Sequence, residues 1–329
     1  MRSAIAIAMP HNQRMPSQPS FSIRDSAFAV FIIVSWGLNF VVMKWGLASW
    51  TPFQMGAARY LLAAFPLILF IRPRGLPWRW VLLYGVAQGI GQFGFLFTAL
   101  KLGMTASLAS VLMQTQVFFT ALFGFMFLKE RLHRAQFVGL GLAALALVCF
   151  AMHFVVGAGA ASGASVKSLV TVAGFALCLC AAASWAASNI VARKAQEAAP
   201  GYDSIAFVVW SAAVPIVPFV LLSAWLDTTG VTAVMRSLTQ APLEAWTVAA
   251  YLGWIATIAG YAMWTNLLKR HTANRVAPLS LGVPVVGIAA GMLLLGESVS
   301  AWQWAGVACV GAALAVVLFG ARFLSKNGK

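Results

Sequence analysis

Long apolar runs separated by short polar gaps make up most of this chain. From residue 27 onward, charges, prolines and glycines divide the sequence into ten runs, each close to the roughly 20 residues that an α-helix needs to cross a bilayer. The pattern predicts ten transmembrane helices at residues 27–46, 53–71, 80–100, 104–128, 135–152, 169–191, 204–225, 246–268, 276–296 and 301–319. Two connections are longer than the others, at residues 157–166 and 226–245.

Residues 124–147 share a skeleton with residues 291–314, which lie 167 positions further along the chain. In each stretch an apolar run ends in a short polar turn that holds a glutamate, and a Gly-rich apolar run follows. The seven identical pairs are Gly124/Gly291, Leu128/Leu295, Glu130/Glu297, Gln136/Gln303, Gly139/Gly306, Ala146/Ala313 and Leu147/Leu314. We therefore predict that a five-helix module occurs twice in the chain. The expected divisions are a disordered cytoplasmic tail at 1–26, a first repeat at 27–152, a linker at 153–168, a second repeat at 169–320 and a cytoplasmic tail at 321–329.

Because five is an odd number, the second module must enter the membrane from the opposite side to the first. The predicted fold is therefore an all-α polytopic membrane protein with ten transmembrane helices in two inverted five-helix repeats. With the amino terminus in the cytoplasm, 17 of the 22 Lys and Arg residues fall on the cytoplasmic side and four outside, with Arg59 inside the second run. This bias follows the positive-inside rule and places both termini in the cytoplasm.

The composition supports a membrane protein, since 61% of the residues are hydrophobic and 9% are charged. A soluble protein usually carries about 25% charged residues. The net charge of +15 would suggest nucleic acid binding in a soluble chain, but here cytoplasmic Lys and Arg beside anionic lipid explain it. The expected partners are the lipid bilayer and a small-molecule substrate, without nucleic acid. A monomer is feasible, and the sequence leaves the oligomeric state open.

The chain offers no pattern typical of enzymes. No nucleophile with a base, metal cluster or cofactor loop stands out, and the four cysteines lie in apolar runs without His or carboxylate neighbours. We therefore expect no catalysis, no metal and no cofactor. None of the seven carboxylates lies deep in a predicted span, so we also expect no intramembrane carboxylate that carries protons.

Inverted repeats allow alternating access, in which a site near the bilayer midplane opens first to one side and then to the other. Polar and aromatic side chains halfway along the runs are the candidates, because such positions are costly for polar groups in lipid. The candidate substrate-binding residues are Trp36, Asn39, Gln88, Gln92, Ser110, Gln114, Trp185, Asn189, Tyr261, Trp264 and Ser280. Each also has a structural interpretation, since buried amides and hydroxyls often tie helices together and aromatic rings fill space.

Three further expectations concern neighbouring positions. Gln116 lies about 200° around an ideal helix from Gln114, so it should face away from the site. Arg59 could hold a substrate carboxylate or extend to the membrane interface, and the sequence favours the second. The glycines of the two closing runs are expected to serve close helix packing rather than binding; they are Gly139, Gly141, Gly306 and Gly311.

Several motifs resemble the EamA branch of the drug/metabolite transporter superfamily over about residues 28–322. They are WGLNF at 36–40, LKERL at 128–132, RVAPLSL at 275–281 and VPV at 283–285. Residues 93–132 and 210–219 resemble most closely the bacterial inner-membrane exporters of cysteine and O-acetylserine. The resemblance implies ten helices in two inverted modules, and export of small amino-acid-like metabolites across the bacterial inner membrane.

The substrate stays open at this point. Relatives of the same architecture export aromatic amino acids, other metabolites or toxic compounds, and an aromatic cage of Trp36, Trp185, Tyr261 and Trp264 would favour such bulkier solutes. A more distant alternative is a non-transporting membrane receptor or scaffold. Its sign would be a folded soluble domain or a long interaction loop, and the sequence has neither. The energy source is equally open.

Overall fold

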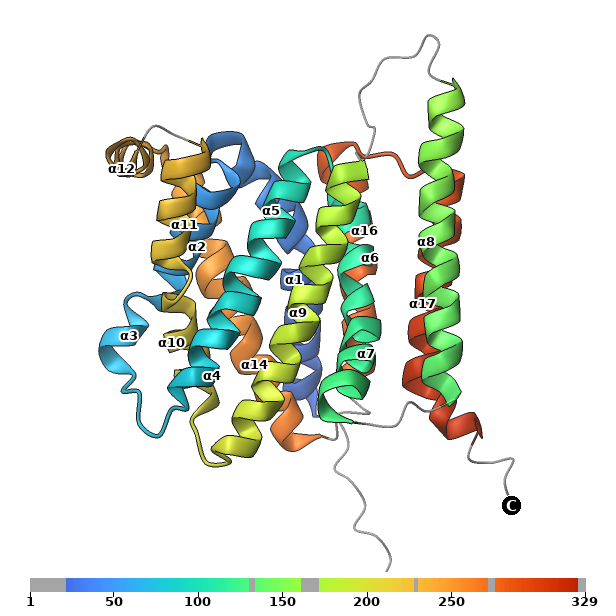
Figure 1. Cartoon of the computed structure of the whole chain (residues 1–329), viewed down its shortest axis with the longest axis horizontal. Helices are drawn as coiled ribbons and strands as arrows, with labels where there is room; N and C mark the ends of the chain where they lie inside the picture. The colour runs from blue at the N-terminus through green and yellow to red at the C-terminus, as the bar shows by residue number, and fades with distance from the viewer. Residues whose placement is uncertain (1–21, 130–133, 161–171, 228–229, 272–275, 325–329) are drawn as a thin grey trace, which may run out of the picture.

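The computed structural model describes residues 22–129, 134–160, 172–227, 230–271 and 276–324 (Figure 1). Glu130, most of the expected amino-terminal tail and much of the expected linker lie outside these ranges. The described residues form helices and no strand. The first half contains α1 (Ile23–Ser49), α2 (Pro52–Ala64), α3 (Leu67–Phe70), α4 (Trp78–Tyr84), η1 (Gly85–Phe93), α5 (Gly94–Lys101), α6 (Ala106–Leu112), η2 (Met113–Thr115), α7 (Gln116–Leu128) and α8 (Arg134–Ala160).

The second half contains α9 (Val172–Ala198), α10 (Ser204–Ala213), α11 (Ile216–Leu222), η3 (Ser223–Asp227), α12 (Val231–Thr239), α13 (Leu243–Ala250), η4 (Tyr251–Ala259), α14 (Gly260–Arg270), η5 (Ala277–Leu281), α16 (Gly282–Leu295) and α17 (Ala301–Leu324). The structure differs from the predicted bounds at two of the connections. The helix α8 continues to Ala160, into the stretch expected to be a linker. The helix α12 forms within the connection at 226–245 and lies across the direction of the other helices in Figure 1, where it is seen end-on.

Seven helical stretches of the described chain are long and apolar enough to cross a membrane, and two shorter apolar helices follow at Leu279–Leu295 and Ala301–Val317. The seven are Ile23–Ser49, Pro52–Phe70, Trp78–Lys101, Ala106–Leu128, Arg134–Met152, Val172–Ala198 and Ser204–Asp227. Helix also continues from α13 through η4 into α14, where the eighth run was expected, but its Trp and Tyr residues make it less apolar. Multi-pass membrane helices are thus confirmed, while the count of ten and the inverted repeat stay predictions.

Local breaks in the helices recur in both halves. The π-helical turns of η1 and η4 begin at Gly85 and Tyr251, 166 positions apart and so close to the spacing of the repeat. The 3-10 turn of η2 lies within the fourth run, and that of η5 lies at the start of the ninth. Two helices also end alike. Lys129 and Gly296 both adopt the left-handed conformation and donate their backbone N–H to the carbonyls of Gly124 and Gly291. This helix-ending motif suits glycine, and Lys129 adopts it with φ of 55°.

The closing helices of the two halves, α8 and α17, pack along each other at one edge of the bundle (Figure 1). A Cβ at Gly139 would overlap Val317, and one at Gly306 would lie 2.7 Å from the ring of Phe150. Close packing is therefore confirmed for these two glycines. The same expectation is wrong for Gly141 and Gly311, because a Cβ added at either would meet no neighbouring atom of the described residues within 4 Å.

The two ends of the bundle are held by different polar contacts. In Figure 1 the carboxyl ends of α7, α9 and α14 lie at the lower end, together with the α3–α4 connection. There Asp25, near the start of α1, accepts from Arg270 at 3.3 Å and pairs with His271 at 3.0 Å. The carboxyl ends of α5 and α16 lie at the upper end, where Glu297 contacts α6.

Candidate functional site

A cavity of about 310 Å³ lies among helices of both halves. Side chains from α1, α2, η1, α5, α6, η2 and α7 of the first half line it, together with side chains from α9, η4, α14, η5, α16 and α17 of the second. Small-molecule sites in proteins occupy about 300–1,000 Å³, so the cavity suits a small solute. The lining residues are Trp36, Asn39, Phe40, Arg59, Gln92, Phe93, Leu96, Ser110, Met113, Gln114, Gln116, Val117, Trp185, Asn189, Ala256, Tyr261, Trp264, Ser280, Val283 and Leu314.

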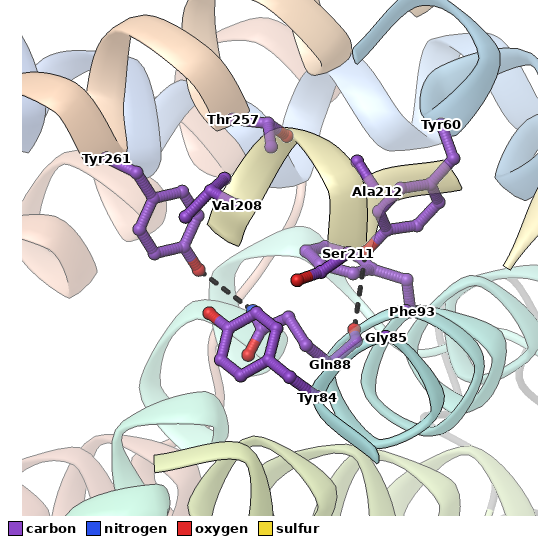
Figure 2. Close-up of a pocket in the computed structure, with 11 residues that line it drawn as sticks. Tyr60, Tyr84, Gly85, Gln88, Phe93, Val208, Ser211, Ala212, Thr257 and Tyr261 are labelled. Atoms are coloured by element: carbon purple, nitrogen blue, oxygen red, sulfur yellow. Dashed lines mark hydrogen bonds between the residues drawn. The ribbon is translucent and has the colours of Figure 1, made fainter. Parts of the chain in front are cut away.

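Ten of the eleven candidate residues from the sequence line this one cavity. The exception is Gln88, which lies at a smaller neighbouring pocket of about 20 Å³ (Figure 2). There its side-chain Nε2 donates to the hydroxyl of Tyr261 at 2.8 Å, and its Oε1 accepts from Ser188. Gln88 is thus engaged by the protein, and it touches the cavity through Tyr261. That these residues bind a substrate stays a prediction.

The polar candidates fall into two groups according to their hydrogen bonds. Gln114 donates to the backbone carbonyl of Ser280 at 2.8 Å, and Asn189 donates to the side-chain oxygen of Gln116 at 2.9 Å. These amides tie helices together. By contrast, Asn39 Oδ1 and Gln92 Oε1 are buried and find no hydrogen-bond partner among the described residues. A buried acceptor without a partner costs about 1–3 kcal/mol, so these two oxygens would be stabilised by a donor brought within hydrogen-bond distance.

The expectation that Gln116 faces away from the cavity is wrong, because Gln114 and Gln116 both line it. The 200° separation assumes a continuous α-helix. The chain instead passes through the 3-10 turn of η2 at Met113–Thr115 before α7 begins, so ideal α-helical spacing does not describe the two side chains. Gln116 also accepts a hydrogen bond from Asn189 of the neighbouring helix α9.

Arg59 does not extend to the membrane interface, as the sequence had favoured. Arg59 is 2% exposed and lines the cavity. The side-chain Nη2 donates to Thr257 at 2.9 Å, and the guanidinium carbon lies 3.7 Å from the ring centroid of Phe93. A cation at the wall of an internal cavity is placed to meet an anionic group there.

Aromatic rings cover one side of the cavity. Trp36 lies 5.4 Å from Tyr261 and 5.6 Å from Trp264, measured between ring centroids, and its indole N–H donates to the carbonyl of Ala256 at 2.9 Å. Gly260 makes this possible, because an added Cβ there would lie 2.5 Å from the indole nitrogen. Trp185 also lines the cavity from α9. The three clustered rings form a wall of apolar surface with a fixed shape.

Sequence reasoning missed the apolar part of the lining and two polar residues. The missed residues are Phe40, Arg59, Phe93, Leu96, Met113, Gln116, Val117, Ala256, Val283 and Leu314. An apolar side chain gives no signal in a helix that is apolar all round. Spacing could have found two of them, since Phe40 lies one helical turn after Trp36 and Leu96 lies one helical turn after Gln92.

Near the upper end of the bundle, Glu297 follows the end of α16 and contacts Ala106 and Ser107 at the start of α6 and Lys44 of α1; we call this contact the α6–α16 seam. Glu297 accepts from the backbone N–H groups of Ala106 at 2.7 Å and Ser107 at 2.8 Å, and from the Ser107 hydroxyl at 2.7 Å. Lys44 lies 3.4 Å from the same carboxylate. Ser107 stands one helical turn from the lining residue Ser110, to which its carbonyl is hydrogen bonded at 2.7 Å.

Comparisons with known proteins agree on the kind of protein. The model of the EamA-like transporter family matches residues 26–152 and 172–319. A Salmonella typhimurium protein named "Probable amino-acid metabolite efflux pump" is 40% identical over 301 residues, which cover 92% of this chain and 97% of that protein. An Escherichia coli protein of the same name is 38% identical over 302 residues, covering 92% and 97%.

A solved crystal structure shares the fold, with a TM-score of 0.59 and 19% identity, and the match covers 92% of this chain and 100% of that chain. The relatives are transporters rather than enzymes, which confirms that expectation, and they imply a small-molecule substrate and a place in the membrane. The resemblance read from the sequence motifs is confirmed as well. The chain belongs to the EamA-like transporter family.

Proposed function

We propose that the protein exports small amino-acid-like metabolites, of the cysteine and O-acetylserine type, by alternating access. The observation that carries this proposal is the cavity in which Asn39 and Gln92 hold buried, unpartnered oxygen atoms. An amide oxygen accepts hydrogen bonds from an ammonium group without requiring a buried charge. The names of the Salmonella and Escherichia relatives point to the same class of solute.

The proposal includes how the chain sits in the membrane. We place it in the bacterial inner membrane with both termini in the cytoplasm, as two five-helix modules of opposite orientation. The family model matches two stretches, and the same π-helical and 3-10 turns occur in both, which supports a repeat. The lower end of Figure 1, where α9 and α14 end, would then face the cytoplasm, and the α6–α16 seam would close the outer side.

Export of aromatic amino acids or other bulkier compounds is the second candidate. It is favoured by the wall formed by Trp36, Tyr261 and Trp264, on which a flat ring could stack. The volume of about 310 Å³ favours the smaller solutes, because it lies at the lower end of the range for ligand sites.

Efflux from proteoliposomes tests the proposal. The purified full chain is reconstituted, and the vesicles are loaded in parallel with labelled L-cysteine, O-acetyl-L-serine or L-phenylalanine. We expect the first two to leave faster than from protein-free vesicles, and faster than L-phenylalanine. Preferential release of L-phenylalanine would support the second candidate instead. If none of the three leaves faster than from protein-free vesicles, export of amino-acid-like solutes is refuted.

A further inference from the structure

We infer that Arg59 binds the carboxylate of the transported solute, so that an anionic group is a requirement for recognition. This inference rests on the proposed function and assigns one end of the substrate to one side chain. The Arg59 residue is 2% exposed and lines the cavity. Its Nε and Nη1 atoms are buried and find no hydrogen-bond partner among the described residues.

No counterion accompanies this cation within the described part of the chain. The ion pairs found there join Lys44 with Glu297, and Asp25 with Arg270 and His271. A guanidinium group keeps its charge in proteins, and a buried charge without a partner is expensive. A site that keeps such a cost in its empty state gains most from a ligand that supplies the missing anion.

The surroundings of Arg59 hold the guanidinium in place rather than neutralise it. One nitrogen donates to the Thr257 hydroxyl at 2.9 Å, and the ring of Phe93 lies 3.7 Å from the guanidinium carbon. Thr257 belongs to the π-helical turn η4, which approaches α2 closely at Gly253. A Cβ at Gly253 would lie 2.9 Å from the carbonyl oxygen of Arg59. The guanidinium is thereby held in one position, which reduces the entropy lost on binding.

The remaining polar atoms fit the other end of an amino acid. Asn39 Oδ1 and Gln92 Oε1 are acceptors without partners, so they suit an ammonium group. Arg59 supplies donors alone, so it suits a carboxylate. One zwitterion can satisfy both sets, whereas a simple amine or a neutral amide leaves the guanidinium unpaired. The cavity therefore selects the amino-acid backbone, and its aromatic wall receives the side chain.

The alternative is a structural role, in which Arg59 stabilises the fold through Phe93 and Thr257. The two roles predict opposite results for Arg59→Gln. A structural role requires the unliganded variant to unfold at a lower temperature. The carboxylate role allows an unchanged or higher unfolding temperature, because the variant no longer buries an unpaired charge, while binding of the acid is lost.

The test compares L-cysteine with L-cysteinamide, which lacks the carboxylate, under reducing conditions. Binding is measured as the ligand-dependent rise in the thermal midpoint of the purified full chain, and transport as efflux from proteoliposomes. We expect Arg59→Gln to weaken L-cysteine binding roughly 10-fold to 150-fold, as for the loss of a charged hydrogen bond. Binding of L-cysteinamide should be weak and equal in both proteins. Arg59→Lys should recover part of the affinity, and Arg236→Gln on the exposed face of α12 is the matched control that leaves it unchanged.

The outcomes separate this inference from the proposed function. If the wild-type protein prefers L-cysteine and Arg59→Gln keeps that preference, Arg59 does not bind the carboxylate, although export of amino acids stands. The same holds if the wild-type protein treats acid and amide alike, or if Arg59→Gln unfolds at a lower temperature with its ligand preference intact. If the wild-type protein neither binds nor moves either compound, both the proposed function and this inference fail.

Discussion

Replacing Glu297 by Gln should loosen the α6–α16 seam and expose the cavity to the upper end of the bundle. One carboxylate oxygen accepts from the N–H of Ala106, and the other from the N–H and the hydroxyl of Ser107. Gln offers one oxygen and one NH₂ group. Whichever way the amide turns, at least one backbone donor at the start of α6 faces another donor, and Lys44 loses its counterion.

The size of the effect follows from these contacts. Hydrogen bonds to a charged group contribute about 1.5–3 kcal/mol each, and the side chain of Glu297 is 7% exposed, so solvent does little to replace them. In the alternating-access cycle proposed above, the seam forms only while the upper end is closed. Losing one such bond therefore shifts the equilibrium between closed and open states by roughly 10-fold to 150-fold toward the open state.

Thiol labelling measures this shift. Ser110→Cys places a thiol at the cavity wall, in a background where the four native cysteines are replaced by Ala. A membrane-impermeant maleimide is then added from the side that the seam closes. We expect Glu297→Gln to raise the labelling rate by that factor, whereas Glu244→Gln, an exposed acid on α13, serves as the matched control without effect. Equal labelling in Glu297→Gln and the parent protein would refute the gating role of the seam.

Three further predictions concern other parts of the molecule. Gly139→Leu should lower the thermal midpoint in detergent by an amount that corresponds to about 1–3 kcal/mol, because Val317 already occupies the space. The control Gly141→Leu should leave the midpoint unchanged, and equal midpoints of the two variants would contradict this packing. Asn39→Ala should weaken apparent substrate affinity roughly 5-fold to 150-fold at unchanged thermal midpoint, because its oxygen has no protein partner to lose, and a lowered midpoint with normal affinity would show a structural role instead. A reporter fused after Lys329 should be active in the cytoplasm, and activity in the periplasm alone would remove the inverted-repeat hypothesis.

Much of the cavity could be predicted because a polar side chain within a membrane helix is costly in lipid and therefore faces the interior of the bundle or a cavity. Asn39, Gln92 and Gln114 stand out in apolar runs, and each of them reaches the cavity. The sequence could not show which of these three amides already has a hydrogen-bond partner. Gln114 is already bonded to the carbonyl of Ser280, whereas Asn39 and Gln92 keep a free oxygen, and this difference depends on the neighbouring helix.

The errors about Gln116 and Arg59 have different physical origins, and the first is a departure of the helix from ideal geometry. The 3-10 turn at Met113–Thr115 brings Gln116 to the cavity, and the amino-acid sequence of that stretch contains no Pro or Gly to announce it. Arg59 was misplaced for a second reason. Its distance from the end of the run suggested contact with the interface, but the side chain finds Thr257 and Phe93, which lie far away in sequence.

The glycine contacts between α8 and α17 have a consequence for how the two halves can change over time. Gly139 of α8 packs against Val317 of α17, and Gly306 of α17 packs against Phe150 of α8. The two glycines lie 167 positions apart, and so do Phe150 and Val317, so each contact repeats the other with the two helices interchanged. Such reciprocity is typical of the contact between two identical subunits of a symmetric dimer. Within one chain it couples distant positions: a larger residue at 139 would overlap Val317, and a smaller residue at 317 would relieve that overlap. We therefore expect substitutions at 139 and 317, and at 306 and 150, to depend on each other, as substitutions at paired positions of a subunit interface do.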